Sequence, residues 1–156
     1  MPLQYDEIHN EYNRLCAGTI DNFEISINET NIERLSLNKI GYVRINVYEK
    51  EGPVPHFHIE GDGFSCCVCI FDNIYFDHGI HTDTLNKSQC KQLDEFMRDK
   101  SEIDPIHTNW EMCKILWEAD NVQSNDNINI VNRYRMMYGD RKQQPDYTDI
   151  RGYKKN

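Results

Sequence analysis

The sequence has no apolar run near the roughly 18 residues that a membrane-spanning helix needs, and it has no basic start followed by an apolar stretch. We therefore expect neither a membrane partner nor a signal peptide, and we expect the protein in the cytoplasm. Cys66 and Cys69 have Cys-x-x-Cys spacing, but the sequence holds no second pair of this kind, which argues against a zinc ribbon. A glycine-rich phosphate loop is also missing, because Gly61-Asp62-Gly63 is too short for one and is typical of a turn. At 156 residues the chain has the length of a single domain with one core.

The six cysteines do not by themselves predict disulfides, because no secretion signal accompanies them. Cys66, Cys67 and Cys69 crowd into an apolar, strand-like run, where free cysteine packs as a small hydrophobic side chain. We expect buried thiols. Burial disfavours the thiolate that a nucleophilic cysteine needs, so cysteine-based catalysis has little support.

Charge is distributed unevenly along the chain. The formal net charge is −9, which argues against a nucleic-acid partner because an acidic surface repels phosphate. Residues 133–156 nevertheless carry seven Lys/Arg against three Asp, together with four tyrosines. We interpret residues 1–132 as one α+β domain and residues 133–156 as a basic, tyrosine-rich and loosely ordered tail. Its tyrosines and arginines could stack on bases, but packing onto the body or onto a protein partner is favoured.

Alternation of apolar and polar residues predicts a series of short strands. Val43, Ile45 and Val47 fall on one face of an extended segment, as a half-buried strand requires. Turn signals separate this segment from those that follow, so the strands should form an antiparallel meander. The expected strands cover about residues 42–48, 56–60, 64–71 and 74–76, and the pattern around residues 23–27 is compatible with one more.

Helical periodicity marks three further segments. The first covers residues 3–16 and the second about residues 87–100. The third begins at Thr108, because Thr108 and Glu111 have the spacing of a capping box. Together these elements predict an α+β fold. In it, a small antiparallel sheet of about four strands packs against one N-terminal helix and two C-terminal helices.

The sharpest chemical feature is the run Pro55-His56-Phe57-His58. On a strand, residues two apart project from one face, so the two imidazoles should lie side by side with their backbones about 7 Å apart. That spacing suits two ligands of one metal or two groups around one phosphate. It also suits a His pair that faces solvent or closes a hydrogen-bond network.

A catalytic zinc site needs a third protein ligand. Glu60 on the same face is one candidate, and His78 and His81 from the following loop are the others. Asp77 and Asp83 could orient these imidazoles as hydrogen-bond acceptors. The predicted metal ligands are therefore His56, His58, Glu60, His78 and His81, with a divalent metal such as zinc as the cofactor.

Two stretches carry a resemblance to a known family: Gly52-Pro53-Val54-Pro55-His56-Phe57-His58-Ile59 and Asn109-Trp110-Glu111. Residues 43–117 resemble the prokaryotic domain-of-unknown-function family 4160, whose members have a strand, an acidic turn, Pro-Pro-His-Phe-His-Val and two later helices. The likeness covers about half the chain, and Val54 stands where the family has its first proline.

The resemblance implies a small α+β fold, a prokaryotic or phage setting and a toxin–antitoxin-like role. It also marks His56 and His58 as the positions of interest, but it implies no particular reaction.

Two functions from different classes remain open. The first is an accessory or regulatory protein that acts by binding another protein, with homo-oligomers also open; the acidic body and basic tail favour it. The second is a metal-dependent hydrolase or nuclease-like toxin in which His56 and His58 are catalytic, either as metal ligands or as acid and base on a phosphate. The hydrolase hypothesis requires the pair and a third ligand atom to converge within about 4–5 Å, because metal–ligand bonds are near 2 Å.

Overall fold

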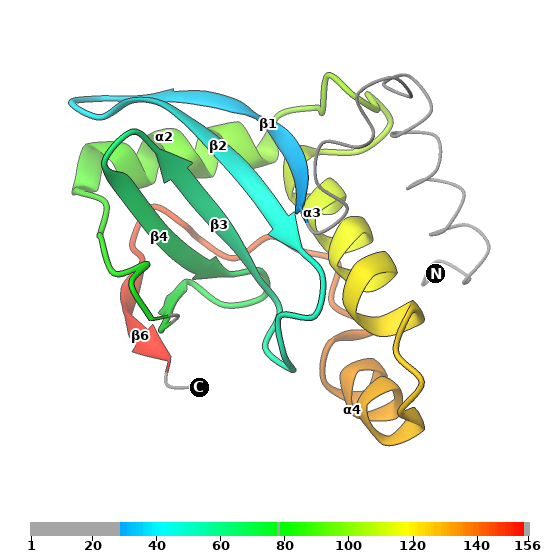
Figure 1. The fold of residues 1–156 in the computed structure, drawn as a ribbon. Coiled ribbons are helices and arrows are strands. Elements are labelled where there is room, and N and C mark those ends of the chain that lie inside the picture. The colour runs from blue at the N-terminus through cyan, green and yellow to red at the C-terminus, as the bar shows by residue number, and fades with distance from the viewer. Residues whose placement is uncertain (1–28, 78, 155–156) are drawn as a thin grey trace.

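The computed structural model describes residues 29–77 and 79–154 of the chain (Figure 1). The helix predicted over residues 3–16, the segment around residues 23–27 and His78 lie outside the described residues.

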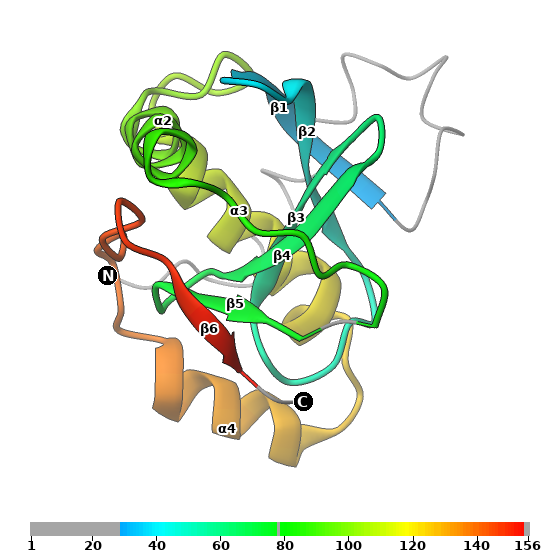
Figure 2. The same cartoon turned by 90° about the vertical axis from the view of Figure 1, so that its left-hand side faces the viewer.

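A six-stranded sheet forms the centre of the protein, in the order β1-β2-β3-β4-β5-β6. The first five strands pair antiparallel in sequence order, and β6 pairs parallel with β5 (Figure 2). The strands are β1 (Glu29–Leu37), β2 (Gly41–Tyr48), β3 (His56–Gly61), β4 (Phe64–Cys69), β5 (Ile74–Phe76) and β6 (Arg151–Lys154). The α+β class is confirmed, but the expectation of about four antiparallel strands is wrong because β1 and β6 extend the sheet at its two edges.

Strands β2 and β3 form where the alternation predicts them. Val43, Ile45 and Val47 are buried, and they share the core face with Phe57 and Ile59 of β3. A two-residue turn containing Gly63, at φ +72°, then leads into β4. Glycine suits this left-handed position because it has no Cβ to clash.

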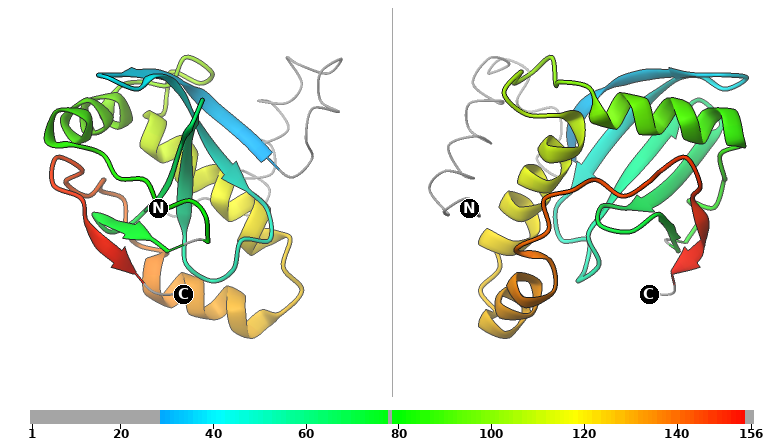
Figure 3. Two further views of the ribbon diagram at one scale, coloured as in Figure 1. Left: turned by 60° about the vertical axis from the view of Figure 1, so that its left-hand side comes forward. Right: turned by 180° about the vertical axis from the view of Figure 1, so that it is seen from behind.

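Two helices cover the core face of the sheet. Helix α2 (Lys87–Arg98) crosses it, and α3 (Asn109–Trp117) runs next to α2 (Figure 3, right). The predicted capping box at the start of α3 is present: the Thr108 hydroxyl accepts from the Glu111 N–H, and the Glu111 carboxylate accepts from the Thr108 N–H. Side chains of both helices join those of β2, β3 and β4 in one apolar cluster, which includes Leu93, Met97, Trp110, Cys113 and Leu116.

After α3 the chain makes a π-helical turn, η2 (Glu118–Gln123), and then forms α4 (Ile128–Tyr138). The expected domain boundary at residue 132/133 falls inside α4. Part of the segment beyond it packs against the body of the protein. Tyr147 is fully buried, and its hydroxyl is 2.8 Å from the Cys69 carbonyl oxygen and 2.9 Å from that of Ile70. Tyr134, Tyr138 and Tyr147 of the predicted tail therefore belong to the core.

The five cysteines that the structure describes are buried, as the sequence predicts. Among the described residues, no helix combines the length and apolar character that crossing a membrane requires.

Candidate metal centre

The face of the sheet that lies opposite α2 carries a polar cluster. His56, His58 and Glu60 alternate along β3 with Phe57 and Ile59, whose side chains belong to the core face. The predicted same-side arrangement of the two histidines is therefore present, with 5.3 Å between their ring centroids. Both histidines are buried, at 1% and 2% exposure, whereas Glu60 is half-buried.

Strand register adds three further side chains to this face. His58 lies between Asn46 of β2 and Cys67 of β4, and Ser65 of β4 is opposite Glu60. Neighbouring residues on adjacent strands project from the same side, so these groups surround the histidine pair.

The loop between β2 and β3 contributes an acidic residue that sequence reasoning did not identify. Glu51 Oε1 lies 2.6 Å from Nε2 of His58 and 3.6 Å from Nε2 of His56. Asn121 of η2 holds this loop: its Oδ1 accepts from the Glu51 N–H at 2.9 Å, and its amide donates to the Tyr48 carbonyl at 2.9 Å. The position of Glu51 thus depends on a residue 70 positions away in the sequence.

Electrostatics favours an ionised Glu51 beside a neutral His58. Burial alone would raise the pKa of Glu51, but hydrogen bonds and electrostatic interaction with the two imidazoles hold it well below its ordinary value. Burial lowers the pKa of His58, although its hydrogen bond to Glu51 opposes the shift. A neutral His58 that donates from Nε2 to the Glu51 carboxylate agrees with the lowered pKa of both residues. Its Nδ1 then carries the lone pair that binds metals.

Nδ1 of His58 faces two potential metal donors. Cys67 Sγ lies 3.4 Å away, and Glu60 Oε1 lies 3.9 Å away. The Glu60 carboxylate is itself held in place, because it accepts a hydrogen bond from the Tyr48 hydroxyl at 2.5 Å and one from the Asn46 amide at 3.2 Å.

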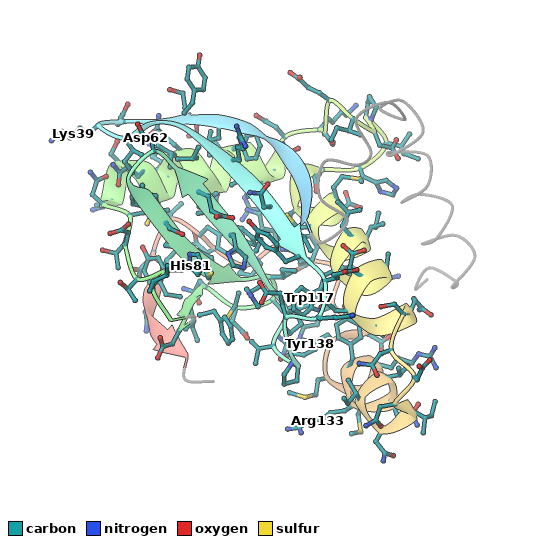
Figure 4. All side chains as sticks on the ribbon, viewed as in Figure 1. Lys39, Asp62, His81, Trp117, Arg133 and Tyr138 are labelled. Carbon is teal, nitrogen blue, oxygen red and sulfur yellow. The ribbon has the colours of Figure 1, made fainter. Side chains whose placement is uncertain are left out.

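His81 reaches the cluster from the loop between β5 and α2. A backbone bridge between Cys66 and Thr82 anchors this loop along β4. The Ser65 hydroxyl contacts Nδ1 of His81, whose ring lies 5.0 Å from that of His58 at 81°. Figure 4 shows His81 over β4, on the face of the sheet turned away from α2. The predicted ligand His81 therefore does join His58 and Glu60.

The donors form two groups, in each of which one ligand atom per residue lies within 4.8 Å of the others. We call His58, Glu60 and His81 the outer set, because Glu60 and His81 are half-buried. His56, His58 and Cys67 form the inner set, in which all three residues are buried. Four of the five predicted ligands thus lie in one group or the other.

His56 lies on the inner side of the cluster. Its Nδ1 is 2.7 Å from the Val54 carbonyl oxygen, and its ring stacks on Phe76 at 4.2 Å between centroids. The ring of Trp117, at the end of α3, is also close, with 5.1 Å between its centroid and that of His56. The ring is therefore fixed in an apolar pocket and does not reach Glu60 or His81 as a member of the outer set.

A pocket of about 330 Å³ opens next to Glu60 on the same face. Its lining includes Arg44, Asn46, Glu60 and Asp62. Asn46 is 2% exposed, and in the portion of the chain that the structure describes its Oδ1 accepts no hydrogen bond. A buried amide oxygen without a donor is costly, so it marks a position where a ligand group would be stabilised.

No family model matches the chain, and comparison with curated proteins and with solved structures finds no match either.

Proposed function

We propose that the protein is a divalent-metal-dependent hydrolase whose metal binds to the outer set, His58, Glu60 and His81. The observation that supports this most is the pairing of Glu51 with Nε2 of His58, while Nδ1 of the same ring faces Glu60. Metal-binding histidines generally donate their second N–H to a carboxylate or carbonyl, which fixes the ring and raises its basicity. His81 has an equivalent partner in Ser65.

Two imidazoles and one carboxylate are the ligands of several hydrolytic metal sites, and they leave a coordination position for water. A metal there supplies a water of lowered pKa and polarises the bond to be cleaved. Glu60 is held by Tyr48 and Asn46, so the carboxylate is oriented before a metal arrives. Glu60 also lines the pocket, so the outer set adjoins the pocket through this ligand.

Arg44 indicates the class of substrate. Its side chain is exposed, lines the pocket and belongs to the residue directly opposite Glu60 in the sheet. A guanidinium beside a metal site suits a phosphoester, because it can bind phosphate oxygens in a bidentate fashion. We therefore place the phosphate of the substrate between Arg44 and the outer set.

Binding of Mn²⁺ to chelator-treated protein and hydrolysis of bis(p-nitrophenyl) phosphate with Mn²⁺ added test this function. Wild-type protein should bind one divalent ion and hydrolyse the ester, and Glu60→Gln should lose both properties. Glu102→Gln is the matched control, because Glu102 is exposed and lies outside the cluster. Absence of metal binding in the wild type, or full activity in Glu60→Gln, would contradict the proposal.

The outer side of α4 supports a second candidate function, that of a toxin–antitoxin-like accessory protein that binds an acidic protein partner. Met136 is 83% exposed and Met137 43%, and the same helix carries the exposed basic side chains of Arg133 and Arg135. Exposed methionine with arginine suits an apolar, acidic surface. Affinity capture, followed by direct titration of the purified partner, tests this candidate. Binding should be lost in Arg133→Glu/Met136→Glu, and a partner that binds the variant unchanged would exclude α4.

A further inference from the structure

We propose that the inner set, His56, His58 and Cys67, is a second metal site, and that it takes a thiophilic divalent cation such as Zn²⁺. The hydrolase proposed above does not use Cys67 or His56. Both are nevertheless buried next to His58, with one ligand atom of each residue within 4.8 Å of the others. A thiolate and two imidazoles are ligands that zinc prefers.

The spacing of the donors fits a tetrahedral ion. Zn–N bonds near 2.0–2.1 Å and a Zn–S bond near 2.3 Å, at a tetrahedral angle, separate nitrogen from sulfur by about 3.6 Å. Cys67 Sγ and Nδ1 of His58 are 3.4 Å apart. The Cys67–His58 distance therefore fits the ion, which displaces the thiol proton to solvent as it binds.

His56 is oriented to take part. Nδ1 of the ring donates to the Val54 carbonyl, so in the neutral ring Nε2 carries the lone pair. Stacking on Phe76 fixes the plane of the ring. Glu51 Oε1 lies 3.6 Å from this Nε2, where its negative charge balances that of the bound cation.

The two sets cannot bind metal at the same time, because they share one nitrogen. Glu51 holds Nε2 of His58, and Nδ1 is the atom that faces both Cys67 at 3.4 Å and Glu60 at 3.9 Å. An ion at the inner set therefore withdraws His58 from the outer set. Thiolate favours zinc over manganese, whereas carboxylate suits manganese, so the two ions should divide between the sets. This consequence, zinc inhibition of the hydrolase, rests on the function proposed above, but the inner site itself does not.

Cobalt spectroscopy tests the inner site without an activity assay. Titration of chelator-treated wild-type protein with Co²⁺ should produce a thiolate-to-cobalt charge-transfer band in the near ultraviolet. The band should vanish in Cys67→Ser and persist in Glu60→Gln. Cys69→Ser is the matched control: Cys69 is also buried and lies on the same face of β4, but it is outside the inner set, so the band should remain. A wild type without the band overturns the proposal even if Cys67→Ser fails to fold. A band that survives Cys67→Ser, or that disappears in Cys69→Ser, also overturns it.

Displacement of Mn²⁺ tests the exclusion between the sets. Protein loaded with Mn²⁺ should release it as free ion, seen by electron paramagnetic resonance, when one equivalent of Zn²⁺ is added. Hydrolysis should fall in parallel. A nitrogen and carboxylate site also binds Zn²⁺ more tightly than Mn²⁺, so a parallel titration uses Co²⁺, whose thiolate band reports the inner set. Release of Mn²⁺ should rise together with this band, and a band that appears while Mn²⁺ stays bound refutes the exclusion. If no ester is hydrolysed but the cobalt band appears, the hydrolase proposal fails and the inner site stands.

Discussion

Glu51→Gln best tests whether Glu51 orients the metal ligand His58 or binds the metal itself. The Glu51 carboxylate does not belong to the outer set, but it accepts from Nε2 of His58 at 2.6 Å. Glutamine has nearly the same shape and keeps one acceptor oxygen, so the hydrogen bond can persist while the negative charge is lost. The variant therefore removes the electrostatic support of His58 without opening a cavity.

The expected loss of metal affinity follows from the contact between Glu51 and His58. Removal of a carboxylate that supports a metal-binding histidine weakens metal affinity by about 10–100-fold. This corresponds to roughly 1.4–2.7 kcal/mol of binding free energy. We expect Glu51→Gln to fall in this range for Mn²⁺, whereas Glu60→Gln, which removes a ligand, should lose more. Glu49→Gln is the control, since Glu49 lies in the same loop and outside both donor groups.

Isothermal titration of the chelator-treated proteins with Mn²⁺ measures these affinities, and thermal unfolding of the metal-free forms confirms that they are folded. If Glu51→Gln bound Mn²⁺ as tightly as the wild type, His58 would not be the ligand that Glu51 orients. A loss equal to that of Glu60→Gln would make Glu51 itself a ligand. Either result refutes the arrangement proposed for the outer set.

Three further predictions concern stability. Burial lowers the pKa of His58, so the folded state binds fewer protons than the unfolded state, and stability should fall as pH decreases below the ordinary histidine value. Urea unfolding should show this fall, by up to about 1.4 kcal/mol per pH unit, and His58→Gln should reduce it. The Ile70 carbonyl oxygen accepts hydrogen bonds from the Trp110 indole N–H at 2.7 Å and from the Tyr147 hydroxyl at 2.9 Å. Trp110→Phe and Tyr147→Phe therefore each leave one of these donors in place. The double variant should lose about 1 kcal/mol more free energy of unfolding than the two single variants lose together. Additive losses would contradict the shared acceptor. Gly61→Ala places a Cβ 2.9 Å from a side chain of β2, which should cost about 1–3 kcal/mol in the same assay, and an unchanged midpoint would refute this close approach.

Local patterns identified the centre of the sheet and the two helices on its core face. The alternation in β2 and the capping box of α3 involve residues that are close in sequence, so a short segment of sequence is enough to predict them. The edge strands depend on distant partners. β1 packs along β2 with a mostly polar sequence, and the four residues of β6 join β5 only because the buried Tyr147 brings the C-terminal segment back to the sheet.

The same distinction applies to the site. The shared face of His56, His58 and Glu60 follows from the two-residue period of a strand. The position of Cys67 beside His58 can also be predicted from the sequence, once the register of the hairpin is considered. A two-residue turn pairs Gly61 with Phe64, and this register places Cys67 opposite His58.

Glu51 could not be found in this way, because a hydrogen bond from η2 fixes its loop. Lys50 and Gly52 on either side of it both have positive φ, so the loop follows no strand period from which a direction could be read. Its position therefore depends on helix packing at the far end of the core. The carboxylate that decides which nitrogen of His58 is available to a metal is set by tertiary structure alone. Changes in α3 or η2 should consequently alter metal binding although they lie outside both donor sets.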